Sequence, residues 1–108
     1  MEAFYKANHI RIINKDCRFM EELGDESVDL LATDPPYGIG FMGKDWDKAL
    51  PDKKIWRECL RVLKPGAFAF VMSIPRMDCL SRMGVSLEEA GFKTSFSPIY
   101  WCFASGFP

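Results

Sequence analysis

Four consecutive residues, Asp34-Pro35-Pro36-Tyr37, carry side chains that can hold a flat base bearing an amino group. Two prolines in a row fix φ and donate no backbone hydrogen bond, so the chain turns away here with carbonyls available as acceptors. The Asp34 carboxylate and the Pro35 carbonyl can each accept one amino hydrogen, and the Tyr37 ring can stack on the base. The tetrapeptide therefore predicts a pocket for adenine or cytosine.

The apolar run 28–33 leads directly into this tetrapeptide and must position it. A run with almost no polar residue favours a strand buried on both faces, as in a parallel sheet. Hydrophobic periodicity and turn residues predict the other elements on either side of it. In chain order we expect a strand at 9–14, a helix at 17–23, a strand at 28–33, a helix at 52–63, a strand at 67–72, a helix at 76–90 ended by Gly91, and a strand at 93–101.

This alternation predicts an open α/β sheet of about four strands with flanking helices. Ligands bind at the carboxyl ends of the strands in such sheets. We therefore expect Asp16, Asp34 and residues 73–75 to lie along one edge, with residues 100–108 passing near it.

The segment 37–51 contains several glycines, and its apolar residues follow neither helical nor strand spacing. This pattern predicts a long loop. Its apolar residues Phe41, Met42 and Trp46 either clamp the base or DNA, or seat the loop on the core. We expect Trp56 and Trp101 to pack in the core.

Length and composition indicate one domain, residues 1–108, without a membrane-spanning or export segment, and hence a cytoplasmic protein. The formal net charge is −1, which neither favours nor excludes a nucleic-acid partner. Basic residues gather in 44–64, where they either face phosphates or form a solvated helix surface. The four cysteines are widely spaced and His9 has no partner at ligand spacing, so neither zinc nor a Cys/His nucleophile is expected.

Several blocks in the same order resemble amino-group DNA methyltransferases, especially those of phages and prophages, and the resemblance covers nearly the whole chain from Asn8. They are Asp34-Pro35-Pro36-Tyr37, the stretch 38–47, Arg61-Val62-Leu63-Lys64-Pro65-Gly66, Glu88-Glu89-Ala90-Gly91-Phe92 and Ser105-Gly106-Phe107-Pro108.

The resemblance implies a Rossmann-like, S-adenosylmethionine-dependent methyltransferase that flips its target base out of DNA, as restriction-modification enzymes do. Asp34 and the Pro35 carbonyl then accept the amino hydrogens, Pro36 holds the turn, and Tyr37 contacts the base together with Phe41 and Trp46. Asp16, Cys17 and Asp34 would contact the cofactor, although an acid such as Asp16 can equally cap a turn.

The glycine-rich cofactor loop and the target-recognition region of such enzymes are absent from this sequence, which resembles their catalytic half. We therefore expect the isolated chain to be inactive, and either a complementing C-terminal half or a homo-oligomer to cover its open sheet. An aspartate in the first position of the tetrapeptide resembles adenine-N6 enzymes. The alternatives are a cytosine-N4 enzyme, an RNA or protein methyltransferase, and a non-catalytic binding or assembly module.

Overall fold

Two strands that run in the same direction position the tetrapeptide. In the computed structural model, which describes residues 5–38 and 50–104, β3 (Val28–Thr33) pairs in parallel with β4 (Leu63–Val71). Leu30 lies opposite Phe68 and Thr33 opposite Val71. Parallel strands need a crossover, and here it includes α1 (Lys53–Val62).

Both helices begin and end close to where the sequence predicts. The Asp52 carboxylate accepts the Lys54 N–H at 2.9 Å and so caps α1. The second helix, α2 (Met77–Ala90), ends at Gly91, whose φ of 119° suits glycine. The two predicted helices at 52–63 and 76–90 are therefore confirmed, as is the strand at 28–33. The expected burial of this strand on both faces is wrong among the described residues, since Leu30 and Ala32 are exposed.

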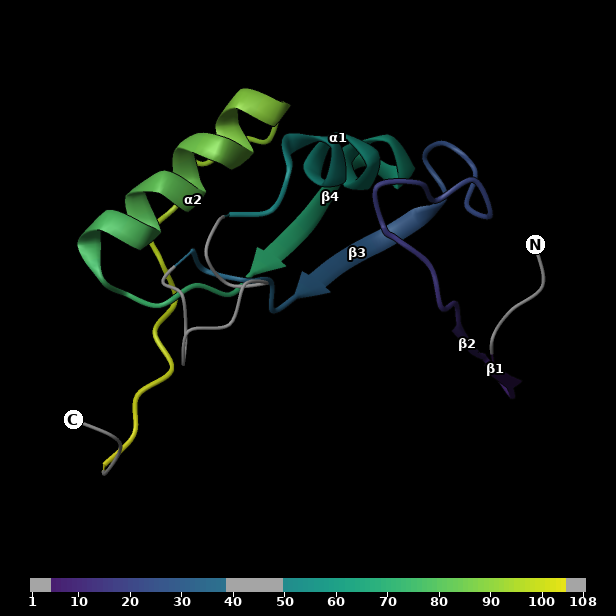
Figure 1. Cartoon of the computed structure of the whole chain (residues 1–108), viewed down its shortest axis with the longest axis horizontal. Coiled ribbons are helices and arrows are strands. Elements are labelled where there is room, and N and C mark those ends of the chain that lie inside the picture. Colours follow the sequence, from purple (N-terminus) through teal and green to yellow (C-terminus); the bar gives the residue numbers. More distant parts are fainter. Residues whose placement is uncertain (1–4, 39–49, 105–108) are drawn as a thin grey trace.

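The core lies between the helices and one face of the parallel sheet. Trp56 and Cys59 of α1 form a buried cluster with Met83 and Ala90 of α2. Partly buried side chains pack against this cluster, among them Leu31 of β3, Val71 of β4, Leu87, Phe92 and Tyr37. Both helices lie on the same side of β3 and β4 (Figure 1). The core position expected for Trp56 is confirmed, with 1% of its surface exposed.

The strand expected at 9–14 does form in part, but not in the parallel sheet. Strand β2 (Ile10–Ile12) pairs antiparallel with β1 (Tyr5–Ala7) in a separate two-stranded sheet. Asn8, with φ of 43°, begins the two-residue turn, a conformation that Asn adopts more readily than most residues. The prediction of one four-stranded sheet is therefore wrong for the described residues, which form two sheets of two strands.

The helix predicted at 17–23 is absent, and two isolated turns replace it. The backbone groups that a helix would bond internally instead bind side chains of α1. The Met20 N–H is accepted by Glu58, and Arg61 donates to the carbonyls of Met20 and Leu23. Tertiary bonds have thus overridden the helical spacing of the apolar residues.

The strand expected at 67–72 begins earlier, at Leu63, because the chain passes from α1 into β4 without a loop. A register shift between Val28 and Leu30 accommodates Gly66, which has φ of 81°.

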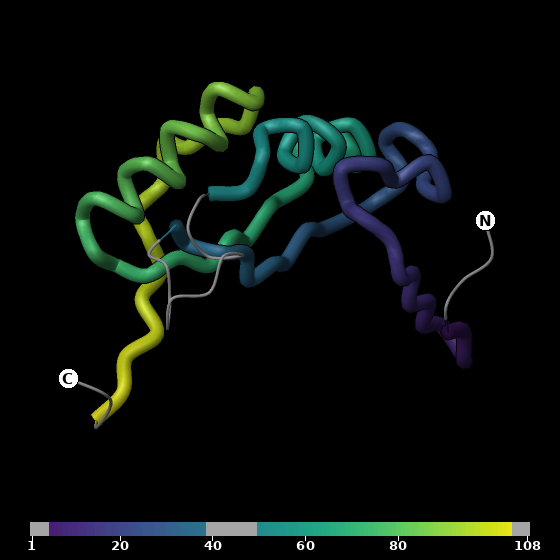
Figure 2. The backbone as a smooth tube through the Cα atoms, viewed as in Figure 1, coloured from purple at the N-terminus to yellow at the C-terminus, as the bar shows by residue number. Residues whose placement is uncertain are grey.

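The last predicted strand, 93–101, does not form. No described strand pairs with it, and the chain runs extended away from α2 (Figure 2). Trp101 is 77% exposed and stacks on Phe103 with ring centroids 6.0 Å apart. The prediction that Trp101 packs in the core is therefore wrong. Neither helix of the described part is long and apolar enough to cross a membrane.

Candidate functional site

The carboxyl ends of β3 and β4 bring the tetrapeptide beside a second segment. The Met72 N–H donates to the Thr33 carbonyl at 2.9 Å, one residue beyond the last strand pair. Asp34 and Ser73 therefore leave the sheet next to each other, which confirms that Asp34 and residues 73–75 share an edge. Asp34 is exposed, whereas Pro35 and Pro36 are half-buried. The Asp34 carboxylate is therefore accessible to solvent, while the half-buried prolines that follow it fix the direction of the backbone.

Tyr37 bridges this carboxylate and the core. Its hydroxyl donates a hydrogen bond to Asp34 Oδ1, and its ring packs against the buried cluster around Trp56. A carboxylate oxygen accepts more than one hydrogen, and Oδ2 is a further acceptor. The bond therefore fixes the direction of the Asp34 carboxylate without using up its capacity to accept hydrogens from an amino group.

Asp16 and Cys17 lie at the first turn after β2, outside the edge formed by Asp34 and Ser73. Asp16 accepts the Arg18 backbone N–H at 2.9 Å and pairs with the Arg18 guanidinium at 2.7 Å. Hydrogen bonds from Arg18 hold the pKa of Asp16 below its usual value. Asp16 and the exposed Cys17 line a hollow of about 110 Å³ together with Phe19 and Met20.

Arg18 also ties this turn to the start of α1, because its guanidinium lies 3.9 Å from the Asp52 carboxylate. The expectation that Asp16 shares one strand edge with Asp34 is wrong, since the segment before Asp16 belongs to the other sheet.

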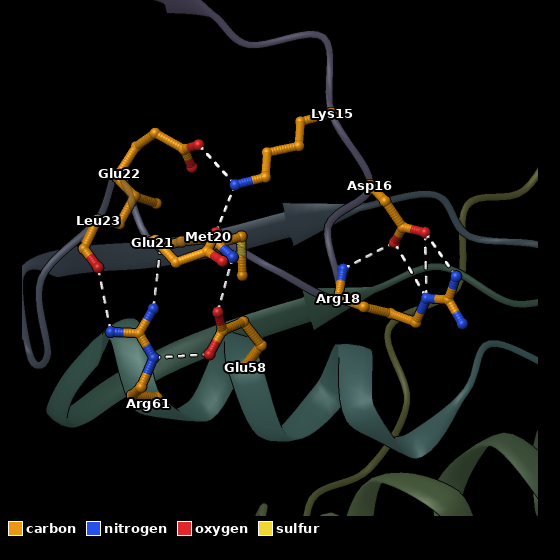
Figure 3. Close-up of polar contacts among 9 residues, drawn as sticks. All are labelled: Lys15, Asp16, Arg18, Met20, Glu21, Glu22, Leu23, Glu58 and Arg61. Atoms are coloured by element: carbon orange, nitrogen blue, oxygen red, sulfur yellow. Dashed lines mark hydrogen bonds and ion pairs between the residues drawn. The ribbon is translucent and has the colours of Figure 1, made fainter. Parts of the chain in front are cut away.

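A polar network that was not predicted from the sequence ties the segment 20–27 to α1. Glu58 Oε2 accepts the Met20 N–H at 2.7 Å, and Glu58 Oε1 accepts Arg61 Nε at 2.6 Å (Figure 3). Arg61 also donates to the Met20 carbonyl at 2.9 Å and pairs with Asp25 at 2.7 Å. Glu58 and Arg61 are three residues apart, a spacing that predicts an ion pair along one helix. The spacing does not predict that both side chains also bind backbone groups of Met20.

Ion pairing changes the titration of this network. The Arg61 guanidinium, with help from the Met20 N–H, lowers the pKa of Glu58 to about 2. Glu58 and Asp25 in turn raise the pKa of Arg61. Lys15 adds contacts to Glu21 and, at 2.8 Å, to Glu22. The network therefore anchors the chain immediately before β3, the strand that carries Asp34.

The basic segment predicted at 44–64 is partly neutralised where it is described. Lys53 pairs with Glu89, Arg61 with Glu58, and Lys64 with Asp29. These contacts favour the solvated helix surface over a dedicated phosphate-binding patch in the described part of this segment.

Three predicted contact residues, Phe41, Met42 and Trp46, lie outside the described residues. A larger hollow of about 440 Å³ opens between Leu50, Lys53, Arg82 and Glu89. No residue of the tetrapeptide lines it, so we do not assign the base to this hollow.

The chain is similar to two curated methyltransferases. It is 32% identical over 78 residues to the type II methyltransferase M.BamHI of Bacillus amyloliquefaciens, a match that covers 61% of this chain and 18% of the relative. It is 26% identical over 113 aligned positions to the type II methyltransferase M2.DpnII of Streptococcus pneumoniae, covering 85% of this chain and 41% of the relative. The chain thus spans less than half of each relative. No family model and no solved structure matches the chain.

Proposed function

We propose that this chain is the base-binding part of a DNA methyltransferase that acts on the exocyclic amino group of adenine. The observation that carries the proposal is the hydrogen bond from Tyr37 to Asp34 at the carboxyl end of β3. It sets an acceptor beside an aromatic ring, the two groups that a flipped amino base requires. The similarity to two type II methyltransferases supports the same reading.

Each residue of the tetrapeptide has a proposed task. Asp34 and the Pro35 carbonyl accept the two amino hydrogens, which draws the nitrogen lone pair out of conjugation with the ring. Pro36 fixes the turn, and Tyr37 stacks on the base. An aromatic amine is a poor nucleophile, so holding it in this geometry near the methyl donor supplies much of the rate.

S-adenosylmethionine supplies the activated methyl group when it is bound. Asp16 and Cys17, with Asp34, are the residues proposed to contact it. The hollow beside Asp16 combines carboxylate oxygens with the apolar side chains of Phe19 and Met20. An acceptor next to apolar walls fits the amino edge and the faces of an adenine ring, which is part of this donor.

Replacement of one carboxylate tests the proposal. In an assay of methyl transfer from S-adenosylmethionine to duplex DNA, the chain is coexpressed with the part of the Streptococcus pneumoniae relative outside the aligned region. We expect Asp34→Ala to lower transfer by about 100-fold or more, because it removes an acceptor at the reacting nitrogen. Asp29→Ala is the matched control, since Asp29 lies exposed on β3, the strand that leads into Asp34, and pairs only with Lys64 among the described residues.

The substrate decides between the remaining alternatives. Transfer to duplexes that contain adenine, but not to duplexes whose only amino base is cytosine, is the expected result. Transfer to RNA or protein alone, or undiminished transfer by the Asp34→Ala variant, would overturn the proposal. Absence of all transfer from a complex that has formed would favour a non-catalytic module.

A further inference from the structure

The hairpin formed by β1 and β2 carries positive charge on one of its two faces. The strands pair so that Lys6 lies directly opposite Arg11. The neighbouring pairs on either side are apolar, namely Tyr5 with Ile12 and Ala7 with Ile10. Successive side chains of a strand point to opposite faces, so Lys6 and Arg11 share one face and the apolar pairs share the other. We call Lys6 and Arg11 the cationic pair.

The cationic pair has no acidic partner in the part of the chain that the structure describes. No aspartate or glutamate occurs between residues 3 and 15 of the sequence. Both side chains are exposed, and neither forms an ion pair or a hydrogen bond with a described residue. Lys15, the next cation along the chain, pairs with Glu22 at 2.8 Å. The fold therefore neutralises the cation that follows the hairpin but not the two on it.

The strand register forces the two positive charges together. Residues directly opposite each other in an antiparallel pair have Cα atoms about 4.5–5.5 Å apart, and like charges in such positions destabilise the pairing. A two-stranded hairpin has little stability of its own in water. The cationic pair therefore weakens the hairpin by itself, and an anion bound to this face would remove the repulsion.

Duplex DNA is an anion whose charge spacing and shape fit this hairpin. It carries one negative charge per about 1.7 Å of helix axis, so its phosphates can neutralise both cations at once. Its major groove, about 12 Å wide, admits a two-stranded β-ribbon. The hairpin forms a sheet of its own and stands clear of both helices and of β3 and β4 (Figure 1). A duplex can therefore approach it without displacing another described element.

The size of the chain allows one duplex to contact both the hairpin and the tetrapeptide. The longest dimension of the chain is 42 Å. One helical turn of DNA is about 34–36 Å long, so a duplex of two turns is longer than the whole chain. A contact at the hairpin is therefore compatible with a target base held at Asp34.

We propose that the cationic pair of the β1–β2 hairpin binds phosphates of the DNA backbone. Lys6 and Arg11 donate charge-assisted hydrogen bonds to phosphate oxygens, which adds affinity and fixes the position of the duplex without reading its sequence. The choice of DNA as the anion rests on the proposed function. The contact itself uses neither Asp34 nor Tyr37 and requires no methyl transfer.

The salt dependence of DNA binding tests this contact. The affinity of the chain for fluorescently labelled duplexes of two unrelated sequences is measured by anisotropy between about 50 and 200 mM salt. The double variant Lys6→Ala/Arg11→Ala should bind both duplexes about tenfold more weakly at the lowest salt. The slope of log affinity against log salt should also shrink by about 2, because two phosphate contacts are lost.

A second double variant, Lys54→Ala/Arg57→Ala, is the matched control. It removes the same two types of charge from α1, where both side chains are exposed and form no ion pair with a described residue. Its salt slope should stay close to that of the wild type.

Two further variants separate the contact from folding and from chemistry. Lys6→Arg/Arg11→Lys keeps both charges and should bind DNA as the wild type does, even if the alanine variant were to lose the hairpin. Asp34→Ala should bind DNA normally while the coexpressed enzyme loses transfer, so failure of the contact and failure of the proposed function give different results.

Four outcomes would overturn the proposal. They are unchanged binding by Lys6→Ala/Arg11→Ala, an equal loss in the Lys54→Ala/Arg57→Ala control, a loss for one of the two DNA sequences only, and binding of the chain to phosphatidylserine vesicles but not to duplex DNA.

Discussion

The Tyr37 hydroxyl donates a hydrogen bond to the Asp34 carboxylate, and the Tyr37 ring rests on the core cluster that includes Trp56. In the proposed function Tyr37 serves two purposes: its ring offers a stacking surface for the base and its hydroxyl orients the Asp34 acceptor. The sequence predicts only the first, because the turn geometry that brings the hydroxyl to Asp34 is not visible in the order of residues.

The two purposes of Tyr37 predict a graded response to substitution. Tyr37→Phe keeps the ring and loses one hydrogen bond, which is worth about 0.5–1.5 kcal/mol, or roughly a 2- to 10-fold loss of methyl transfer. Tyr37→Ala also loses base stacking of about 1–3 kcal/mol and should lose transfer about 100-fold. Single-turnover rates of both variants with the completed enzyme check this order. Equal losses in the two variants would mean that the ring contributes nothing.

The contact of Glu58 with Arg61 and the Met20 N–H should stabilise the folded chain less at acidic pH than at neutral pH. Its pKa falls from an ordinary 4.5 to about 2 on folding. The stabilisation is therefore present in full above about pH 4.5 and is lost as the pH falls towards 2. Glu58→Gln should lower the free energy of unfolding at neutral pH by about 1–3 kcal/mol and weaken its dependence on pH in that window. Urea titrations between about pH 2 and pH 7, a range that extends to both sides of the carboxylate pKa values, measure both effects.

Glu89→Gln is the matched control for Glu58. Glu89 pairs with Lys53 at the surface, where both side chains are nearly half exposed. Such pairs contribute about 0–1 kcal/mol, so the substitution should change stability little. A loss as large as that of Glu58→Gln would show that the network before β3 has no special role.

Two glycines, one in the middle of α2 and one just past its end, should respond to alanine with opposite signs. A Cβ at Gly91 would lie 2.7 Å from Leu60 Cδ2, and φ there is 119°. Gly91→Ala should therefore cost about 1–3 kcal/mol of stability. At Gly84, inside the helix, an added Cβ would meet no atom within 4 Å apart from its chain neighbours and the nearby backbone of the helix itself, and alanine should add about 0.5–1 kcal/mol of stability. Thermal melts of both variants measure the two changes in stability. Destabilisation by Gly84→Ala would mean that this face of α2 packs closely against another part of the chain.

The four cysteines should separate into two reactivity classes. Cys17 and Cys102 are exposed, whereas Cys59 and Cys79 are buried. Burial raises the pKa of Cys59 to about 11, so little thiolate forms at neutral pH. A thiol-specific reagent followed by mass spectrometry should label Cys17 and Cys102 first, and Cys59 and Cys79 only after denaturation. Rapid labelling of Cys59 in the folded chain would contradict the packing of α1 on α2.

Local signals account for the elements that the sequence predicts correctly. Asp52 and Gly91 mark the ends of helices whose apolar stripes are regular, and the run 28–33 has the composition of a parallel strand. The predictions of secondary structure that are wrong concern segments whose conformation depends on residues far away in the sequence. Residues 17–23 have helical spacing, yet Glu58 and Arg61 take their backbone groups, and 93–101 has strand residues without a described strand to pair with.

The sequence by itself determined which chemical groups the tetrapeptide offers, because the carboxylate, the two prolines and the aromatic ring are consecutive residues. It also determined that the tetrapeptide follows a strand, since an apolar run ending at two prolines has few other conformations. Only the tertiary structure decided that the Tyr37 hydroxyl binds Asp34, that Glu58 and Arg61 anchor the chain before β3, and that Phe68 and Phe70 remain uncovered. Each depends on atoms that approach one another only when β3, β4 and the helices have assembled. Local residue preferences do not predict such contacts.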